Sequence, residues 1–184
     1  MAQFYDALDP RQIEFIGEQG LFFVATAPAA GRVNLSPKGL DTFRVLDPKT
    51  LVYLDLTGSG NETAAHLREN GRITVMFCSF GNKPMILRIY GAGAVIAPSH
   101  ADWNALRPHF GDYPGVRQMV RIAVLGVQTS CGYAVPRYEF VSERDQLLRW
   151  AEKRGPEGIR EYQRTTNVLS IDGLETGIEI PSAQ

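Results

Sequence analysis

Residues 72–96 read RITVMFCSFGNKPMILRIYGAGAVI, two runs of β-branched and aromatic residues joined by the turn-forming stretch GNKP. Runs of this composition favour strands, and a short link containing Gly and Pro predicts a β-hairpin. Gly91 and Gly93 interrupt the second run, where glycine permits the bend or bulge that closing a barrel requires. This stretch therefore predicts a curved antiparallel sheet.

Strand-like runs continue on the N-terminal side of this hairpin. They are LFFVATAP (21–28), RVNLSPKG (32–39), TFRVLD (42–47) and TLVYLDL (50–56). In the second run, Val33 and Leu35 alternate with Arg32, Asn34 and Ser36, so that one face of the strand is apolar and the other polar. Asp47 and Pro48 are turn formers, so the last two runs predict a second hairpin.

Helices are predicted at the edges of this sheet. LDPRQIEFIGEQG (8–20) begins with Asp9 as N-cap and Pro10 at the first helical position. A long strand follows within residues 117–136, and residues 142–167 read as two helices broken at Gly155 and Pro156.

Tight hairpins with inserted helices predict a mainly β (α+β) fold, an antiparallel sheet closed into a barrel with peripheral helices, and argue against a doubly wound parallel sheet. We expect a barrel domain over residues 1–140 and a C-terminal helical extension, packed on the barrel, over residues 141–184.

Composition limits the classes of partner. The 184 residues carry a formal net charge of -1, which predicts neither nucleic-acid nor membrane binding. Cys78 and Cys131 are far apart and match no zinc-ligand spacing, so no metal is expected, while a single disulfide stays open. The N-terminus has no signal-peptide pattern, and no apolar run reaches the roughly 20 residues that span a bilayer. We expect a soluble cytoplasmic protein.

The turn TGSGNET (57–63) lies between a strand and a helix, and it has two interpretations. Ser59 and Glu62 fit the S-x-x-E capping box, which would explain the helix start without a ligand. Alternatively, the helix N-terminus exposes N–H groups, and the side chains of Thr57, Ser59, Asn61 and Thr63 add donors that suit a phosphate. Arg32, Lys38 and Arg88 are the nearest candidate cations.

The order of RVNLSPKG, LVYLDLTGSGNETAAHLRENGRITVMF and ILRIYGAGAV over roughly residues 20–130 resembles the flavin-binding split-barrel family typified by pyridoxamine 5'-phosphate oxidase. The resemblance implies an antiparallel split β-barrel of the FMN-binding type. It also implies a homodimer that holds FMN at the subunit interface.

The resemblance assigns cofactor-binding positions on the strand and on the turn. Asn34, Ser36 and Lys38 would lie along the isoalloxazine ring and ribityl chain. The phosphate end would meet Thr57, Ser59, Asn61, Glu62 and Thr63. Glu62 and Thr63 stand where the oxidase carries an Arg-Lys pair, which predicts weaker neutralisation of the phosphate charge.

These features favour a flavoprotein, an FMN-dependent oxidoreductase that takes hydride from a small-molecule electron donor and passes the electrons to oxygen or another small acceptor. A flavin carries its own redox chemistry, so no side-chain acid, base or nucleophile is required, and none is assigned. The segment TTNVLSIDGL (165–174) has no clear counterpart of the oxidase's substrate-binding arginine and histidine, so pyridoxamine phosphate is not the expected substrate. Two alternatives stay open: a non-catalytic carrier of flavin, haem or deazaflavin on the same barrel, and a cofactor-free structural dimer.

Overall fold

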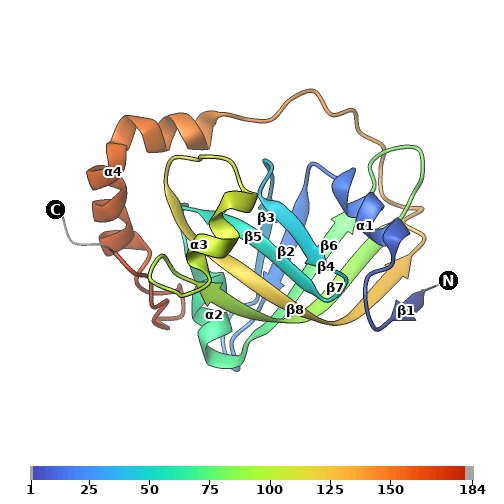
Figure 1. Ribbon diagram of the computed structural model, residues 1–184, viewed down its shortest axis with the longest axis horizontal. Helices are drawn as coiled ribbons and strands as arrows, with labels where there is room; N and C mark the ends of the chain where they lie inside the picture. The colour runs from blue at the N-terminus through green and yellow to red at the C-terminus, as the bar shows by residue number, and fades with distance from the viewer. Residues whose placement is uncertain (1, 181–184) are drawn as a thin grey trace.

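Within residues 2–180, which the structure describes, eight strands form one antiparallel sheet in a computed structural model (Figure 1). The elements run in the order β1 (Gln3–Tyr5), α1 (Pro10–Gly17), β2 (Phe22–Thr26), β3 (Asn34–Lys38), β4 (Phe43–Asp47), β5 (Thr50–Leu56), α2 (Glu62–Asn70), β6 (Arg72–Cys78), β7 (Ile86–Ile96), α3 (Trp103–Leu106), the 3-10 turn η1 (Arg107–His109), β8 (Val116–Ser130) and α4 (Gln146–Thr166).

The strand order is β3-β2-β6-β7-β8-β5-β4, with β1 paired to β8. The predicted hairpins β4–β5 and β6–β7 are both confirmed. The prediction that the sheet closes into a barrel was wrong, because the path of hydrogen-bonded strands ends at β3 on one side and at β4 on the other. Pro37 in β3 has no N–H to donate, and proline within a sheet is confined to edge strands, first residues and bulges. The sheet is therefore a barrel that stays open between these two strands.

Glycine allows two strands to approach closely where the sheet bends. The register of β7 against β8 shifts between Tyr90 and Gly91, and the extra residue on β8 is Leu125. A Cβ added to Gly91 would lie 2.5 Å from Cγ2 of Ile122 and 2.7 Å from the carbonyl oxygen of Ala123. The predicted bulge is confirmed at Gly91, and any larger residue there would force the strands apart.

Side chains fill the interior of the sheet. The main core cluster includes Phe22, Val24, Leu51, Tyr53, Val75, Phe77, Leu87, Ile89 and Ile122, all nearly inaccessible to solvent. A second cluster, which includes Val52, Leu54, Ile96, Leu106 and Met119, packs under α3. Because the centre is packed, ligand binding requires space at the rim of the sheet.

The predicted start of α1 and the predicted break in α4 agree with the structure. The Asp9 carboxylate accepts a hydrogen bond from the N–H of Gln12, and the Gln12 side chain accepts one from the N–H of Asp9, which makes a capping box at α1. Gly155, at φ 66° and ψ 173°, divides α4 into two helical pieces, as predicted (Figure 1).

The C-terminal part of the chain returns to the sheet. After β8 an irregular segment, residues 131–145, crosses the molecule to α4, and the chain beyond α4 runs back alongside α2 (Figure 1). The division of the chain at residues 140 and 141 stays a prediction, and its outer ends, residue 1 and residues 181–184, lie outside the described residues. In the part of the chain that the structure describes, no helix is long and apolar enough to cross a membrane, and no cluster of metal-ligating side chains occurs.

Candidate ligand site

A cavity of about 830 Å³ opens between β3, the turn after β5, the start of α2 and the segment that follows α4. Its size falls within the range of small-molecule pockets. Seven of the eight sequence-predicted residues line it: Asn34, Ser36, Lys38, Ser59, Asn61, Glu62 and Thr63. The strand and the turn that the sequence singled out therefore face one space.

Thr57 is the predicted residue that does not line this cavity. Its hydroxyl accepts a hydrogen bond of 2.8 Å from Nε2 of Gln163 on α4, and its N–H donates to the carbonyl oxygen of Gly115. Thr57 therefore ties the start of the turn to α4.

Of the two interpretations of the turn, the capping box of Ser59 and Glu62 is wrong. Helix α2 begins at Glu62 with Asn61 as N-cap, and no side chain caps it. Both carboxylate oxygens of Glu62 instead lie 3.1 Å from the backbone nitrogen of Ile171, which donates to them. The Glu62 carboxylate therefore accepts from a backbone N–H far along the chain, and not from the first turn of its own helix.

A buried ion pair lies beneath the turn. The Asp55 carboxylate accepts hydrogen bonds from Nζ of Lys38 at 2.7 Å, from Nη2 of Arg117 at 2.7 Å and from Nε2 of Gln118 at 2.9 Å. Burial alone would raise the pKa of Asp55, but the charges of Arg117 and Lys38 outweigh it and hold the pKa well below its ordinary value. Asp55 therefore stays ionised, and Lys38 reaches the cavity as a cation that is already paired.

A chain of neutral polar groups supports the other side of the cavity. Nδ2 of Asn34 donates to Oγ1 of Thr63 at 3.2 Å and lies 3.4 Å from Oγ1 of Thr26, while Ser36 donates to Oδ1 of Asn34. The Thr26 hydroxyl in turn lies 2.9 Å from Nδ1 of the buried His66. This network fixes the amide of Asn34 at the cavity wall.

Tyr53 lies directly below this network. Its hydroxyl approaches Thr63 without a hydrogen bond of normal geometry in the described part of the chain. Burial first, and the nearby Asp55 carboxylate second, raise the pKa of Tyr53 well above its ordinary value. The phenol therefore stays neutral, with Nζ of Lys38 5.4 Å from the centre of its ring.

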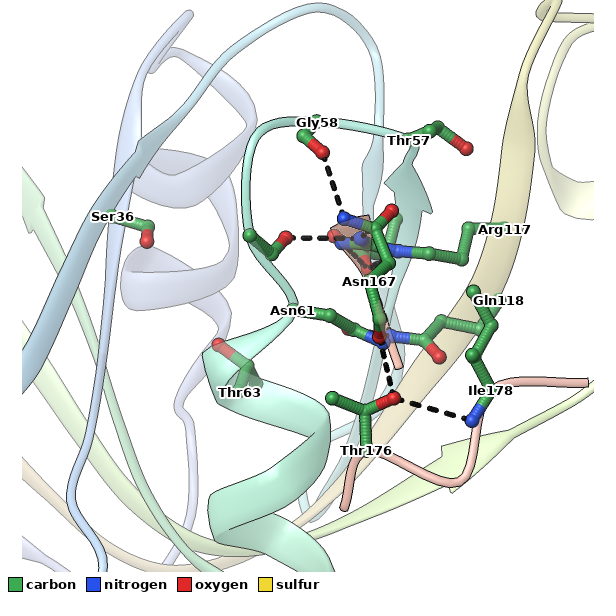
Figure 2. A network of polar contacts seen from close by, with 12 residues as sticks. Ser36, Thr57, Gly58, Asn61, Thr63, Arg117, Gln118, Asn167, Thr176 and Ile178 are labelled. Carbon is green, nitrogen blue, oxygen red and sulfur yellow. Dashed lines mark hydrogen bonds and ion pairs between the residues drawn. The ribbon is translucent and has the colours of Figure 1, made fainter. Parts of the chain in front are cut away.

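The segment after α4 contributes a wall that the sequence analysis did not predict. Asn167 is fully buried between the turn and Arg117 (Figure 2). Its Oδ1 accepts from Nη1 of Arg117 at 2.9 Å, and its Nδ2 donates to the carbonyl oxygen of Gly58 at 3.1 Å. Farther along, Ser170 and Ile171 line the cavity.

Arg32 and Asp172 form an ion pair at the mouth of the cavity. The N–H of Arg32 also donates to Oδ2 of Asp172 at 2.7 Å, and this bond and the Arg32 guanidinium lower the pKa of that carboxyl. The three cations at the cavity are thus all in ion pairs: Arg32 with Asp172, and Lys38 and Arg117 with the shared carboxylate of Asp55.

A second cavity, of about 800 Å³, adjoins the first and shares Pro37, Lys38, Leu56 and Leu147 with it. Its other walls carry the aromatic side chains of Phe80, Tyr138 and Phe140 and the carboxylates of Glu18, Glu139 and Glu143. A ligand lying along β3 would therefore have space for a second molecule beside it.

The residues missed by sequence analysis differ in the signal they give. Asp55 is a lone acid in the apolar run LVYLDL, and a buried carboxylate needs a cationic partner, so a pair could have been predicted there without naming Arg117. Asn167 is the last residue of the predicted C-terminal helices, and nothing in the surrounding sequence marks it for a contact with the turn.

The open antiparallel barrel with peripheral helices and a rim cavity defines a split-barrel protein. The chain matches the family described as pyridoxamine 5'-phosphate oxidase over residues 8–131. It is 39% identical over 199 aligned residues to pyridoxamine 5'-phosphate oxidase family protein ustO of Aspergillus flavus. The alignment covers 95% of this chain and 77% of that protein. The protein therefore belongs to the pyridoxamine 5'-phosphate oxidase family.

Solved structures share the fold at low sequence identity. A variant of HupZ from Group A Streptococcus is 23% identical with a TM-score of 0.53, and covers 66% of this chain and 98% of that one. The FAD-binding protein from Mycobacterium smegmatis is 13% identical with a TM-score of 0.51, and covers 67% and 96%. A protein related to general stress protein 26 from Clostridium acetobutylicum is 14% identical with a TM-score of 0.52, and covers 76% and 99%. These likenesses confirm the split-barrel fold.

Proposed function

We propose that this protein is an FMN-dependent oxidoreductase with small-molecule electron donors and acceptors. The observation that carries the proposal is the rim cavity of about 830 Å³, which is lined by polar residues of β3 and of the turn residues 59–63. Family membership supports it, as does the fold shared with the FAD-binding protein of Mycobacterium smegmatis.

The residues present fit FMN through hydrogen bonds more than through charge. The hydroxyls of Ser59 and Thr63 and the N-terminal N–H groups of α2 are donors suited to a phosphate. Asn34 and Ser36 provide polar groups along the strand where the ring and ribityl chain would lie. Lys38 and Arg117 share Asp55, Arg32 pairs with Asp172, and Glu62 adds a third carboxylate, so the cavity has no large excess of positive charge for a phosphate.

When bound, FMN would supply the two-electron redox chemistry of its ring. The chain's own residues would bind and orient it: the turn would hold the phosphate, and β3 would form a wall for the ring. The adjoining cavity, with its aromatic lining, would admit the electron donor beside Lys38. No side-chain acid or base is needed for this role.

A homodimer is part of the proposal. Val33, Leu35 and Leu125 are 74%, 62% and 70% exposed, and a shallow groove of about 390 Å³ that includes Val33 and Leu125 lies beside them. Apolar side chains exposed together on one sheet face favour association with a second copy of the chain. We further propose a cytoplasmic location, since Cys78 and Cys131, one buried and one exposed, are both free thiols.

The absorption spectrum of the purified protein tests the cofactor. The two bands of an oxidised flavin are expected, and denaturation should release a compound that migrates as FMN in chromatography. A haem Soret band, or a colourless protein that does not take up added FMN, would contradict the proposal.

Anaerobic reduction tests the activity. NADH or NADPH should bleach the flavin bands, and oxygen should restore them. Failure of every donor tried, with flavin firmly bound, would favour the non-catalytic carrier instead.

A further inference from the structure

The segment that follows α4 is bound to the very turn that we propose to hold the phosphate. Asn167 has no exposed surface. Both polar groups of its side chain are bonded to parts of the chain outside the tail: Oδ1 to Arg117 on β8, and Nδ2 to Gly58 in the turn. Its carbonyl oxygen accepts from Oγ1 of Thr176 at 2.6 Å and, at 3.5 Å, from Nδ2 of Asn61 (Figure 2). One asparagine thus joins the turn, the sheet and the tail.

These bonds control the orientation of the turn's peptide groups. The carbonyl oxygen of Gly58 accepts from Asn167, and that of Gly60 accepts from Nη1 of Arg117 at 2.9 Å. In a trans peptide the N–H points opposite to the C=O. Holding these carbonyls toward Asn167 and Arg117 therefore directs the N–H groups of Ser59 and Asn61 the other way.

Part of the cavity lies on the side of the turn away from Asn167, although Arg117, Ser170 and Ile171 also line it from the side of the tail. Figure 2 shows Ser36 and Thr63 on one side of the turn and Asn167 on the other, and both Ser36 and Thr63 line the cavity. Two backbone N–H groups aimed there would add to the hydroxyl donors.

The tail is attached at two further points of the cavity rim. The N–H of Ile171 donates to the Glu62 carboxylate, and Asp172 pairs with Arg32. The region that matches the oxidase family ends at residue 131, so this attachment lies outside it, whereas the alignment with the Aspergillus flavus relative covers 95% of the chain.

We propose that Asn167 is a positioning residue that presets the turn 57–63 for a phosphate, and that docking of residues 167–176 is coupled to binding of the phosphate end of the ligand. The inference rests on the proposed function. Coupling is reciprocal, so a phosphate at the turn must stabilise the docked tail by as much as the docked tail strengthens phosphate binding.

The test compares FMN with riboflavin, which has the same ring and no phosphate. Dissociation constants are measured by quenching of flavin fluorescence for the wild type, Asn167→Ala, Asn167→Asp and a control, Asn104→Ala, at an exposed position on α3. Asn167→Asp keeps the acceptor for Arg117 and loses the donor to Gly58, which guards against a variant that fails to fold. We expect both variants at residue 167 to bind FMN about tenfold more weakly than the wild type and riboflavin unchanged, with the control unaffected.

Hydrogen exchange gives a readout that needs no activity. In the wild type, FMN should slow exchange in residues 57–63 and 167–176 together, and in Asn167→Ala it should lose its effect on the tail. Equal weakening of FMN and riboflavin, or FMN protection confined to the turn, would overturn the inference and leave the proposed function standing. A wild-type protein that binds neither flavin would overturn both.

Discussion

Removing the charge of Asp55 should destabilise the protein strongly, because this carboxylate is the shared acceptor of a buried cluster. It accepts from Lys38, Gln118 and, through both Nε at 3.1 Å and Nη2 at 2.7 Å, from Arg117. The side chains of Asp55 and Arg117 are 3% and 4% exposed, so water cannot replace a lost partner.

The size of the effect follows from what Asp55→Asn leaves behind. An amide has almost the same shape but places N–H groups against donors, and the Arg117 guanidinium is left buried without a counter-charge. Breaking a buried pair from one side costs about 3–5 kcal/mol. For a chain of this size that corresponds to a lower Tm by about 6–20 °C.

The assay is urea unfolding followed by tryptophan fluorescence, with Asp112→Asn as the matched control. Asp112 pairs with Arg107 at 3.0 Å, but its side chain is fully exposed, and such surface pairs contribute about 0–1 kcal/mol. A loss in Asp55→Asn no larger than that in Asp112→Asn would refute the reasoning, since it would mean that the buried pair contributes nothing beyond a surface pair.

Three further outcomes are expected. The pKa of Asp55 is lowered in the folded state, so the contribution of Asp55 to stability is complete above the unfolded pKa of about 3.9 and is lost as pH falls below that value. Urea midpoints of the wild type should therefore drop between about pH 5 and pH 3 more steeply than those of Asp55→Asn, and parallel curves would contradict this prediction. Gly91→Ala should lower the free energy of unfolding in urea by about 1–3 kcal/mol, because the added Cβ meets Ile122 and Ala123. Gly17→Ala, where nothing lies within 4 Å of the added Cβ, should not lower it, and equal effects of the two substitutions would contradict the bulge argument. Glu62→Gln should bind FMN about fivefold more tightly and riboflavin equally well, because a carboxylate and a phosphate about 4 Å apart in water repel by about 1 kcal/mol. A weaker FMN complex in fluorescence titration would show that the hydrogen bond from Ile171 to Glu62 matters more than the charge of Glu62.

Local signals in the sequence predicted the parts of the fold that local forces determine. The hairpin at residues 72–96 and the break at Gly155 each depend on residues within a few positions of one another. Gly91 gave a local signal for the bulge, although the extra residue of the bulge, Leu125, lies on β8. Closure of the barrel was wrong, although Pro37 marks β3 as an edge strand. Whether the two edges of a sheet meet depends on curvature summed over all strands, which no single run encodes.

The residues that line the candidate site could be predicted from the sequence, but the long-range hydrogen bonds that hold the turn in place could not. Periodicity places Asn34 and Ser36 on the polar face of one strand, and the turn is contiguous. The resemblance to the oxidase family then assigned these residues and Lys38 to the cofactor, and all three line the cavity. The bonds that hold the turn join Gly58 to Asn167, 109 positions away, and Glu62 to Ile171, also 109 positions away. Sequence patterns report neighbours along the chain, so they offered a capping box as one of two interpretations of the turn. The structure contradicts that interpretation, because the Glu62 carboxylate accepts from the distant N–H of Ile171.

The pairing of charges at the cavity makes this support decisive. A site with free arginines or lysines attracts a phosphate at long range and tolerates small errors in position, because Coulomb attraction falls slowly with distance. Here Arg32 pairs with Asp172, while Lys38 and Arg117 share Asp55. With the Glu62 carboxylate, which lines the same cavity, the three positive charges are balanced by three negative ones. Phosphate affinity must therefore come from hydrogen bonds, which weaken steeply when donors are misdirected. Affinity then depends on how rigidly the turn is held, and Asn167, through its bond to Gly58, is one of the groups that hold it.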